Sequence, residues 1–117
     1  MGDHEAQLKQ VLYAADDVAA AAEYYGAVFG FATKFVDGDR YAALDAGGTT
    51  LALAGPAEDI TEGRAAAAVK VVDLAATLQD VVAAGGTVIR EPEQGPHEVR
   101  AVVRDPWGNI LVVYASV

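Results

Sequence analysis

The first half of the chain passes from a strand pattern to a helix pattern and back. Side chains of residues 7–15 alternate between two faces, which predicts a strand. Apolar residues then recur at helical spacing from Val18 to Phe29, with Asp16 or Asp17 as the N-terminal cap and Gly30 as the end. Three short strands follow, separated by turns at 37–39 and 47–48, and cover residues 31–36, 41–44 and 49–54.

The second half repeats this order. Residues 65–72 predict a strand, Asp73 caps a helix over 74–84, and Leu74, Leu78, Val81 and Val82 form its apolar stripe. Gly85 and Gly86 end that helix, and strands are predicted over 87–90, 99–104 and 110–115. Between the halves, residues 55–64 contain Gly, Pro and acids without apolar periodicity, which is typical of a linker.

Matching landmarks indicate an internal duplication. Asp17 corresponds to Asp73 at the start of each helix. Asp45 and Gly48 correspond to Asp105 and Gly108, and both of these pairs are the same number of positions apart. We therefore expect one α+β domain over residues 1–117, built from two βαβββ repeats at about 8–55 and about 64–117.

The composition of the chain excludes several kinds of functional site and partner. The chain is 53% hydrophobic, enough for one core, and its lack of cysteine excludes disulfides, thiolate nucleophiles and sulfur metal ligands. No apolar stretch approaches the ~20 residues of a membrane helix, and residues 1–7 do not look like a signal peptide, so we expect a soluble cytoplasmic protein. A formal net charge of −9 disfavours nucleic acid as a partner; it favours solubility or, alternatively, a cationic ligand.

Four motifs stand out in the two halves: Asp17-Val18, Tyr24-Tyr25, Val28-Phe29-Gly30-Phe31 and Asp105-Pro106-Trp107-Gly108-Asn109. Together they resemble the glyoxalase/bleomycin-resistance/dioxygenase group, the vicinal oxygen chelate superfamily. The resemblance extends from Gln10 to Tyr114 and implies curled mixed sheets around a cleft, with the helices outside. It also implies a homodimer, sometimes with strands exchanged between chains.

In the enzymes of that family, a divalent metal in the cleft is held by His, Glu or Gln on the first and last strands of each repeat. The resemblance places these positions at Gln10, Ala52, Ala66 and Val112. Only Gln10 offers a donor atom, whereas a stable site needs at least three side-chain donors. His4 and His97 stand too isolated to rebuild one, so we predict no metal and no other cofactor.

A cleft without a metal is wider and more apolar, which suits an organic ligand. Strand alternation places Lys70 at the rim of this cleft. It predicts that the walls are formed by Gln10, Leu12, Thr50, Ala52, Ala66, Ala68, Val112 and Tyr114. The residues on the opposite faces of these strands should lie beneath the helices. They are Val11, Tyr13, Leu51, Leu53, Val69, Val71, Leu111 and Val113.

Further candidates lie around the expected opening. His97 and Arg100 belong to a Gly- and Pro-rich segment, 93–100, that we expect to be an irregular loop over the cleft. Trp107 occupies a turn at its mouth, as a lid over apolar surface or as a ligand contact. The pattern leaves the face of Tyr41 open.

Each aromatic or titratable candidate also has a simpler interpretation. Tyr114 either stacks on a ligand or packs against a neighbouring subunit. His97 is better read as a solvated loop residue than as a general base, since no orienting partner is evident. Tyr24, Tyr25 and Phe29 follow helical spacing, which predicts core packing.

The leading hypothesis is a non-enzymatic protein that sequesters a small apolar or cationic compound, such as an antibiotic. The alternative is a metal-dependent lyase, isomerase or dioxygenase whose ligands have slipped by one residue along a strand. Slippage would substitute Ala65, Ala67, Leu111 or Val113, none of which is a metal donor. A third hypothesis is a protein-interaction module.

Overall fold

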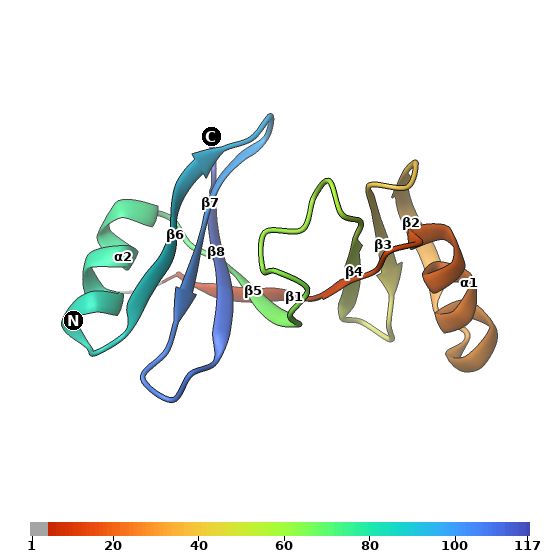
Figure 1. Ribbon diagram of the computed structural model, residues 1–117, viewed down its shortest axis with the longest axis horizontal. Helices are drawn as coiled ribbons and strands as arrows, with labels where there is room; N and C mark the ends of the chain where they lie inside the picture. Colours follow the sequence, from red (N-terminus) through yellow and green to blue (C-terminus); the bar gives the residue numbers. More distant parts are fainter. Residues whose placement is uncertain (1–4) are drawn as a thin grey trace. The chain divides into compact units, whose positions relative to one another are not determined.

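The computed structural model describes residues 5–117 and falls into two compact units (Figure 1). The first unit comprises Gln10–Ala65. The second unit comprises Ala66–Val117 together with the described residues before Gln10. No helix in the described part is long and apolar enough to cross a lipid bilayer.

The first unit has the predicted order of elements. They are β1 (Gln7–Ala14, of which residues 10–14 belong to this unit), α1 (Val18–Phe29), β2 (Ala32–Asp37), β3 (Tyr41–Asp45) and β4 (Thr50–Ala54). The strands lie in the order β2-β3-β4-β1, with β1 parallel to β4 and the other neighbours antiparallel.

The second unit repeats this topology. Its elements are β5 (Ala66–Lys70), α2 (Leu74–Ala83), β6 (Thr87–Gln94), β7 (Glu98–Arg104) and β8 (Ile110–Ser116). The strand order is β6-β7-β8-β5, and β5 is parallel to β8. The α+β class and the duplicated βαβββ unit are therefore confirmed.

The helix starts are equivalent in detail. The carboxylate of Asp17 accepts a hydrogen bond from the Ala20 amide at 3.0 Å, and that of Asp73 accepts one from the Ala76 amide at 3.0 Å. Each cap satisfies a backbone N–H that has no partner within its helix. Gly30 ends α1 with a φ of 75°, a left-handed conformation that glycine adopts without strain.

In each unit the core lies between the helix and one face of the sheet. Val18 of α1 packs with Leu44 and Leu53 in the first unit, and Leu74 and Leu78 of α2 pack against the sheet of the second. All but one of the predicted helix-side residues belong to these clusters: Val11, Leu51, Leu53, Val69, Val71, Leu111 and Val113. The exception is Tyr13, which is 37% exposed. Their strand parity is confirmed, so alternate residues must point to the other face.

The segment 93–100 is not the irregular loop that we expected. β6 continues to Gln94 and β7 begins at Glu98, leaving only a short hairpin turn. The ladder shifts register between Arg90 and Glu93. Pro92, which lacks an N–H to donate, lies within this irregularity and so does not end the strand.

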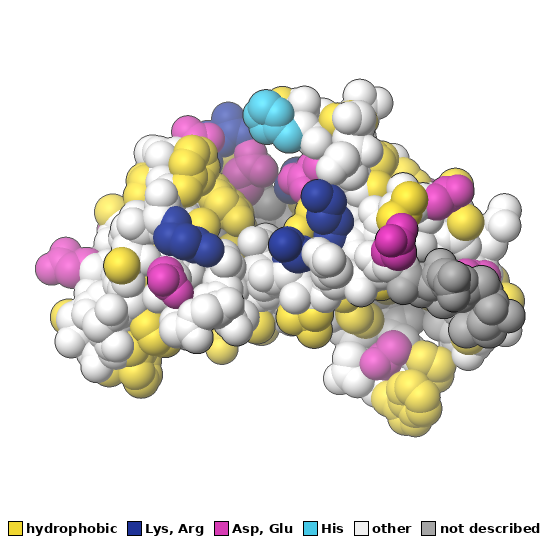
Figure 2. All heavy atoms as spheres, turned by 180° about the vertical axis from the view of Figure 1, so that it is seen from behind, with side chains coloured by type: hydrophobic (Ala, Val, Ile, Leu, Met, Phe, Trp, Pro, Cys, Tyr) yellow, Lys and Arg dark blue, Asp and Glu magenta, His cyan; other side chains and the backbone are white. Residues whose placement is uncertain are grey.

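Some apolar helix positions are exposed, contrary to the prediction. Val82 of α2 is 57% exposed, and Tyr24 and Phe29 of α1 are 58% and 59% exposed. In each of these helices, the side that contacts the sheet is narrower than the side on which the apolar residues lie. Tyr24 and Phe29 instead contact Tyr25, with ring centroids 5.2 and 6.2 Å away. Figure 2 shows hydrophobic side chains, in yellow, at the surface.

Candidate functional site

In the first unit, the sheet face that points away from α1 carries predicted site residues in two rows. A row here is a set of residues that are paired across neighbouring strands. Leu12 is paired with Ala52, and Gln10 with Thr50. Ala52 is fully buried and Leu12 is 8% exposed. The register thus brings these four predicted residues to one face, with apolar side chains in one row and polar side chains in the next.

Tyr41, whose orientation the sequence left open, belongs to the same face. Its neighbour Ala42 packs toward α1, so Tyr41 points the other way. It pairs with Ala54 on β4, and its ring lies 6.3 Å from that of Phe35. Tyr41 therefore borders the apolar row from an adjacent strand.

In the second unit, the face that points away from α2 has an equivalent pair of rows. Lys70, Tyr114 and Arg100 are consecutive partners on β5, β8 and β7. The adjoining row holds Ala68, Val112 and Val102 in the same strand order, and Ala66 lies on this face of β5. The structure thus places Arg100 on a strand beside Tyr114, whereas the sequence predicted a loop at this position.

His97 and Trp107 lie in turns at opposite ends of β7. His97 is exposed in the β6–β7 hairpin, close to the Arg100 end. Trp107 is 83% exposed in the β7–β8 turn. A strand of this length separates the two turns by about 20 Å. Trp107 therefore does not lie near the row of Tyr114, and it covers little apolar surface within its unit.

The turn before β8 is built on one carboxylate. Asp105 accepts hydrogen bonds from the backbone amides of Trp107 and Asn109 at 2.9 and 2.8 Å, and from the Asn109 side chain at 2.9 Å. These bonds lower the pKa of Asp105 below its ordinary value of 3.8, and the bonds from Asn109 contribute most to this shift. Asp45 plays the same part before β4, where the amides of Gly48 and Gly47 lower its pKa.

Because of the Asp105 turn, we expect the stability of the folded chain to fall in acid. A carboxylate with a lowered pKa stabilises the folded chain above its unfolded pKa, and this stabilisation disappears as pH falls through the folded pKa. We expect Asp105→Ala to lower the melting midpoint by a few degrees at pH 7, and the gap to wild type to close as pH falls below about 3.8. Thermal unfolding from pH 7 to pH 2 measures this gap.

Asp16→Ala is the matched control because Asp16 is exposed and precedes the capping Asp17. Its unfolding curve should follow that of wild type throughout. A gap that stays constant for Asp105→Ala down to pH 2 would contradict the assigned role of the carboxylate.

The residues at the family's metal positions do not fit a divalent ion. Of Gln10, Ala52, Ala66 and Val112, only Gln10 has an oxygen donor. Among the described residues, no group of three His, Cys, Asp or Glu side chains is placed to hold a metal. The donor chemistry therefore supports no step through a bound metal.

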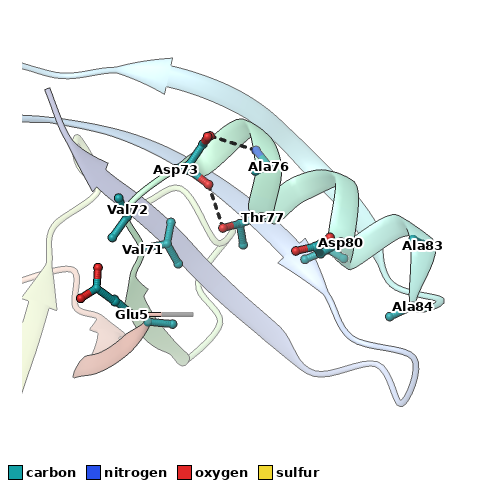
Figure 3. A pocket seen from close by; sticks show the side chains of 11 residues that line it. Glu5, Val71, Val72, Asp73, Ala76, Thr77, Asp80, Ala83 and Ala84 are labelled. Carbon is teal, nitrogen blue, oxygen red and sulfur yellow. Dashed lines mark hydrogen bonds between the residues drawn. The ribbon is translucent and has the colours of Figure 1, made fainter. Parts of the chain in front are cut away.

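A groove lies on the helix side of the second unit (Figure 3). Its volume is about 740 Å³, and an adjoining apolar cavity measures about 270 Å³. Small residues of α2 such as Ala76 and Ala83 leave this space above Val71. Asp73 and Thr77, which line the groove, already bond within the helix start, with Thr77 Oγ1 donating to the Asp73 carbonyl at 2.8 Å. None of the predicted site residues lines either cavity.

Comparison with known proteins places this architecture in a family. Residues 7–113 match the model of the Glyoxalase/Bleomycin resistance protein/Dioxygenase superfamily. An uncharacterized protein of Mycolicibacterium smegmatis is 39% identical over 115 residues, covering 98% of this chain and 97% of that protein.

Two solved structures share the fold. A glyoxalase/bleomycin resistance protein/dioxygenase superfamily member from Vibrio splendidus has a TM-score of 0.70 at 17% identity, covering 97% of this chain and 100% of the other. Streptomyces coelicolor methylmalonyl-CoA epimerase has a TM-score of 0.70 at 21% identity, covering 94% and 96%. Because both identities are low, these likenesses establish the fold alone. The repeated βαβββ topology and the match over residues 7–113 show that the chain belongs to the Glyoxalase/Bleomycin resistance protein/Dioxygenase superfamily.

Proposed function

We propose that this protein binds a small organic molecule on a sheet face that points away from the helix of its own unit, without metal chemistry. The observation that carries the proposal is the make-up of these faces: Ala52, Ala66 and Val112 occupy implied metal positions, and the half-buried rings of Tyr41 and Tyr114 lie in adjoining rows. The exposed parts of the two rings would bind by burying apolar surface, at ~25 cal/mol per Å². Polar side chains in the adjoining rows supply direction.

The alternative is a metal-dependent enzyme, such as a lyase, isomerase or dioxygenase. One observation favours it: Gln10 keeps an amide oxygen in the row that contains Thr50, and Asp45 follows Thr50 in the same row on β3. Asp45, however, already accepts the amides of Gly47 and Gly48 at 3.1 Å each. A single amide donor beside an occupied carboxylate gives weaker support than the apolar rows.

Ligand screening and metal analysis of the purified chain separate the two proposals. We expect native mass spectrometry and thermal-shift screening of a library of small organic compounds to find binders. We also expect metal content well below one ion per chain. One stoichiometric ion with no organic binder would contradict the proposal in favour of the enzyme. The same spectra test the homodimer that we also propose.

A variant pair then locates the site. Tyr114→Ala should weaken binding of the best compound about tenfold, because the ring borders the apolar row of the second unit. Tyr24→Ala is the matched control, since Tyr24 lies on α1 and is 58% exposed. Equal affinity in both variants would place the ligand elsewhere.

A further inference from the structure

The two repeats differ in the side chains beside their helix–sheet cores. The alignment that pairs Asp17 with Asp73 allows equivalent positions of the two units to be compared. In the first unit, four neighbouring aromatic rings lie beside the core, with successive centroids 6.3, 6.2 and 5.5 Å apart. They belong to Tyr13, Tyr25, Phe29 and Phe31.

The second unit has no ring at any of the four equivalent positions. Strand register supports the comparison, since Tyr13 pairs with the fourth residue of β4 and Val69 with the fourth residue of β8. Valine, threonine and glycine fill less space than phenylalanine or tyrosine. The four positions are occupied by Val69, Val81, Gly85 and Thr87.

The apolar cavity of about 270 Å³ lies at two of these positions. Val69 and Val81 line it, and none of the described residues around it is aromatic. Val71 and Val103, which are 8% and 3% exposed, also line it and belong to the core. Val69, Val81 and Leu111 are only half-buried. The cavity therefore offers apolar surface that neither the helix nor the sheet covers.

The groove that adjoins this cavity is acidic. The two spaces share lining residues, among them Val81 and Ala84. Asp73 and Asp80 line the groove from the side of α2, and Glu5 lines it from outside the helix (Figure 3). Among the described residues that line it, none is Lys or Arg. The formal net charge of −9 has the same sign, so a positively charged group is favoured here.

We propose that the helix side of the second unit is a binding site for an aromatic amine. The ring lies in the cavity beside Val69 and Val81, and the ammonium lies among the acids of the groove. The bound ring takes the place that Tyr25 takes in the first unit. An apolar cavity of about 150 Å³ holds a benzene ring, so the volume of about 270 Å³ admits two fused rings. This site goes beyond the proposed function, because it lies on the opposite face of the sheet.

Three probes separate the contribution of the ring from that of the charge: tryptamine, hexylamine and 3-indolepropionate. Tryptamine has both the fused ring and the ammonium, hexylamine lacks the ring, and 3-indolepropionate carries the opposite charge. Each is titrated into protein whose valine and leucine methyl groups are labelled with ¹³C. We expect tryptamine to bind at least tenfold more tightly than either of the other probes, because it alone matches both parts of the site.

Methyl signals show which face of the sheet is occupied. Val103 of β7 packs in the cluster beneath α2, so its neighbour Val102 points to the other face. Tryptamine should shift the methyl signals of Val81 and Val103 and leave those of Val102 and Val112 in place. Shifts confined to Val102 and Val112 would overturn this site and support binding at the face of the proposed function.

Val81→Phe tests the cavity by filling it. The added ring stands at the position equivalent to Tyr25, and it should weaken tryptamine at least tenfold. Val82→Phe is the matched control, because Val82 is 57% exposed and lines neither the groove nor the cavity. If Val81→Phe fails to fold, Ala84→Leu decides with the same expected loss, since Ala84 is exposed and lines both spaces.

Asp80→Asn tests the charge of the groove. Removing one of three acids should weaken tryptamine about threefold. Asp16→Asn is the matched control, because it changes the net charge equally at an exposed position of the first unit and should leave the affinity unchanged. Equal affinity of the two variants would overturn the placement of the ammonium.

The remaining outcomes are equally decisive. The site would be overturned if tryptamine caused no shift, if either other probe bound as tightly, or if tryptamine bound folded Val81→Phe unchanged. Shifts around Val81 that depend on protein concentration without a probe would also overturn it, since a second copy of the chain would then cover the groove. Tyr114→Ala, which tests the proposed function, should leave tryptamine binding unchanged, so the two proposals fail separately.

Discussion

Gly55→Ala is expected to destabilise the folded chain by about 3 kcal/mol or more, at or beyond the upper end of the usual cost of overpacking. A Cβ at this position would lie 2.2 Å from the carbonyl oxygen of Asp39 and 3.3 Å from that of Arg40. The Gly55 amide also donates to the Arg40 carbonyl at 2.7 Å. Because the obstructing atoms are backbone, no side chain can rotate away.

The segment around Gly55 has little freedom to relax. The Gly55 carbonyl accepts the amides of Glu58 and Asp59 at 3.0 Å each, and Arg40 forms an ion pair with Glu58. Relieving the clash would break several of these contacts at once. Urea unfolding followed by circular dichroism measures the loss of unfolding free energy.

Gly95→Ala provides the matched control. At Gly95 the nearest atom to an added Cβ is the Glu98 carbonyl oxygen at 3.5 Å, an ordinary contact. Its unfolding free energy should stay within about 0.5 kcal/mol of wild type, as for most surface substitutions. Equal stability of Gly55→Ala and Gly95→Ala would contradict the close approach of Gly55 to the turn before β3.

The second large effect is expected from Leu44→Ala, which should cost about 2 to 5 kcal/mol. Leu44 is fully buried on β3, where it pairs with Leu51 of β4 and packs in one cluster with Val18 of α1. Truncation removes buried methyl groups and leaves a void between sheet and helix. Urea unfolding again supplies the free energy.

Two further substitutions define the cause of that loss. Leu44→Met keeps most of the volume and should cost less than about 1.5 kcal/mol. Leu8→Ala removes the same atoms from a side chain that is 63% exposed and should have little effect. A loss for Leu8→Ala as large as that for Leu44→Ala would show that truncation in general, and not the buried void, is responsible.

Features set by near neighbours along the chain were predictable from the sequence. α1 runs from Val18 to Phe29 as predicted, since its cap at Asp17 and its end at Gly30 are local hydrogen-bonding and backbone effects. The duplication was also readable, and the carboxylates of Asp45 and Asp105 each accept the backbone amide of the second residue after them. The family could be recognised because its motifs lie at such local sites.

Features that depend on distant pairing were harder to predict. Proline and glycine in 93–100 suggested a loop, whereas pairing with β7 carries β6 through Pro92 at a register shift. The apolar pattern of α2 did not show that Val82 would remain exposed, because only contact with the sheet decides which side of a helix is buried. Tyr41 was assigned a face only by the packing of its neighbour Ala42 toward α1.

The candidate site shows the same division. The sequence by itself determined the chemistry available: apolar side chains at three of the four implied metal positions, one amide at Gln10, and an excess of acids. Only the tertiary structure decided that Lys70, Tyr114 and Arg100 share a row on one face. Residue types are properties of single positions, whereas a row across β5, β8 and β7 joins positions up to 44 residues apart through strand register.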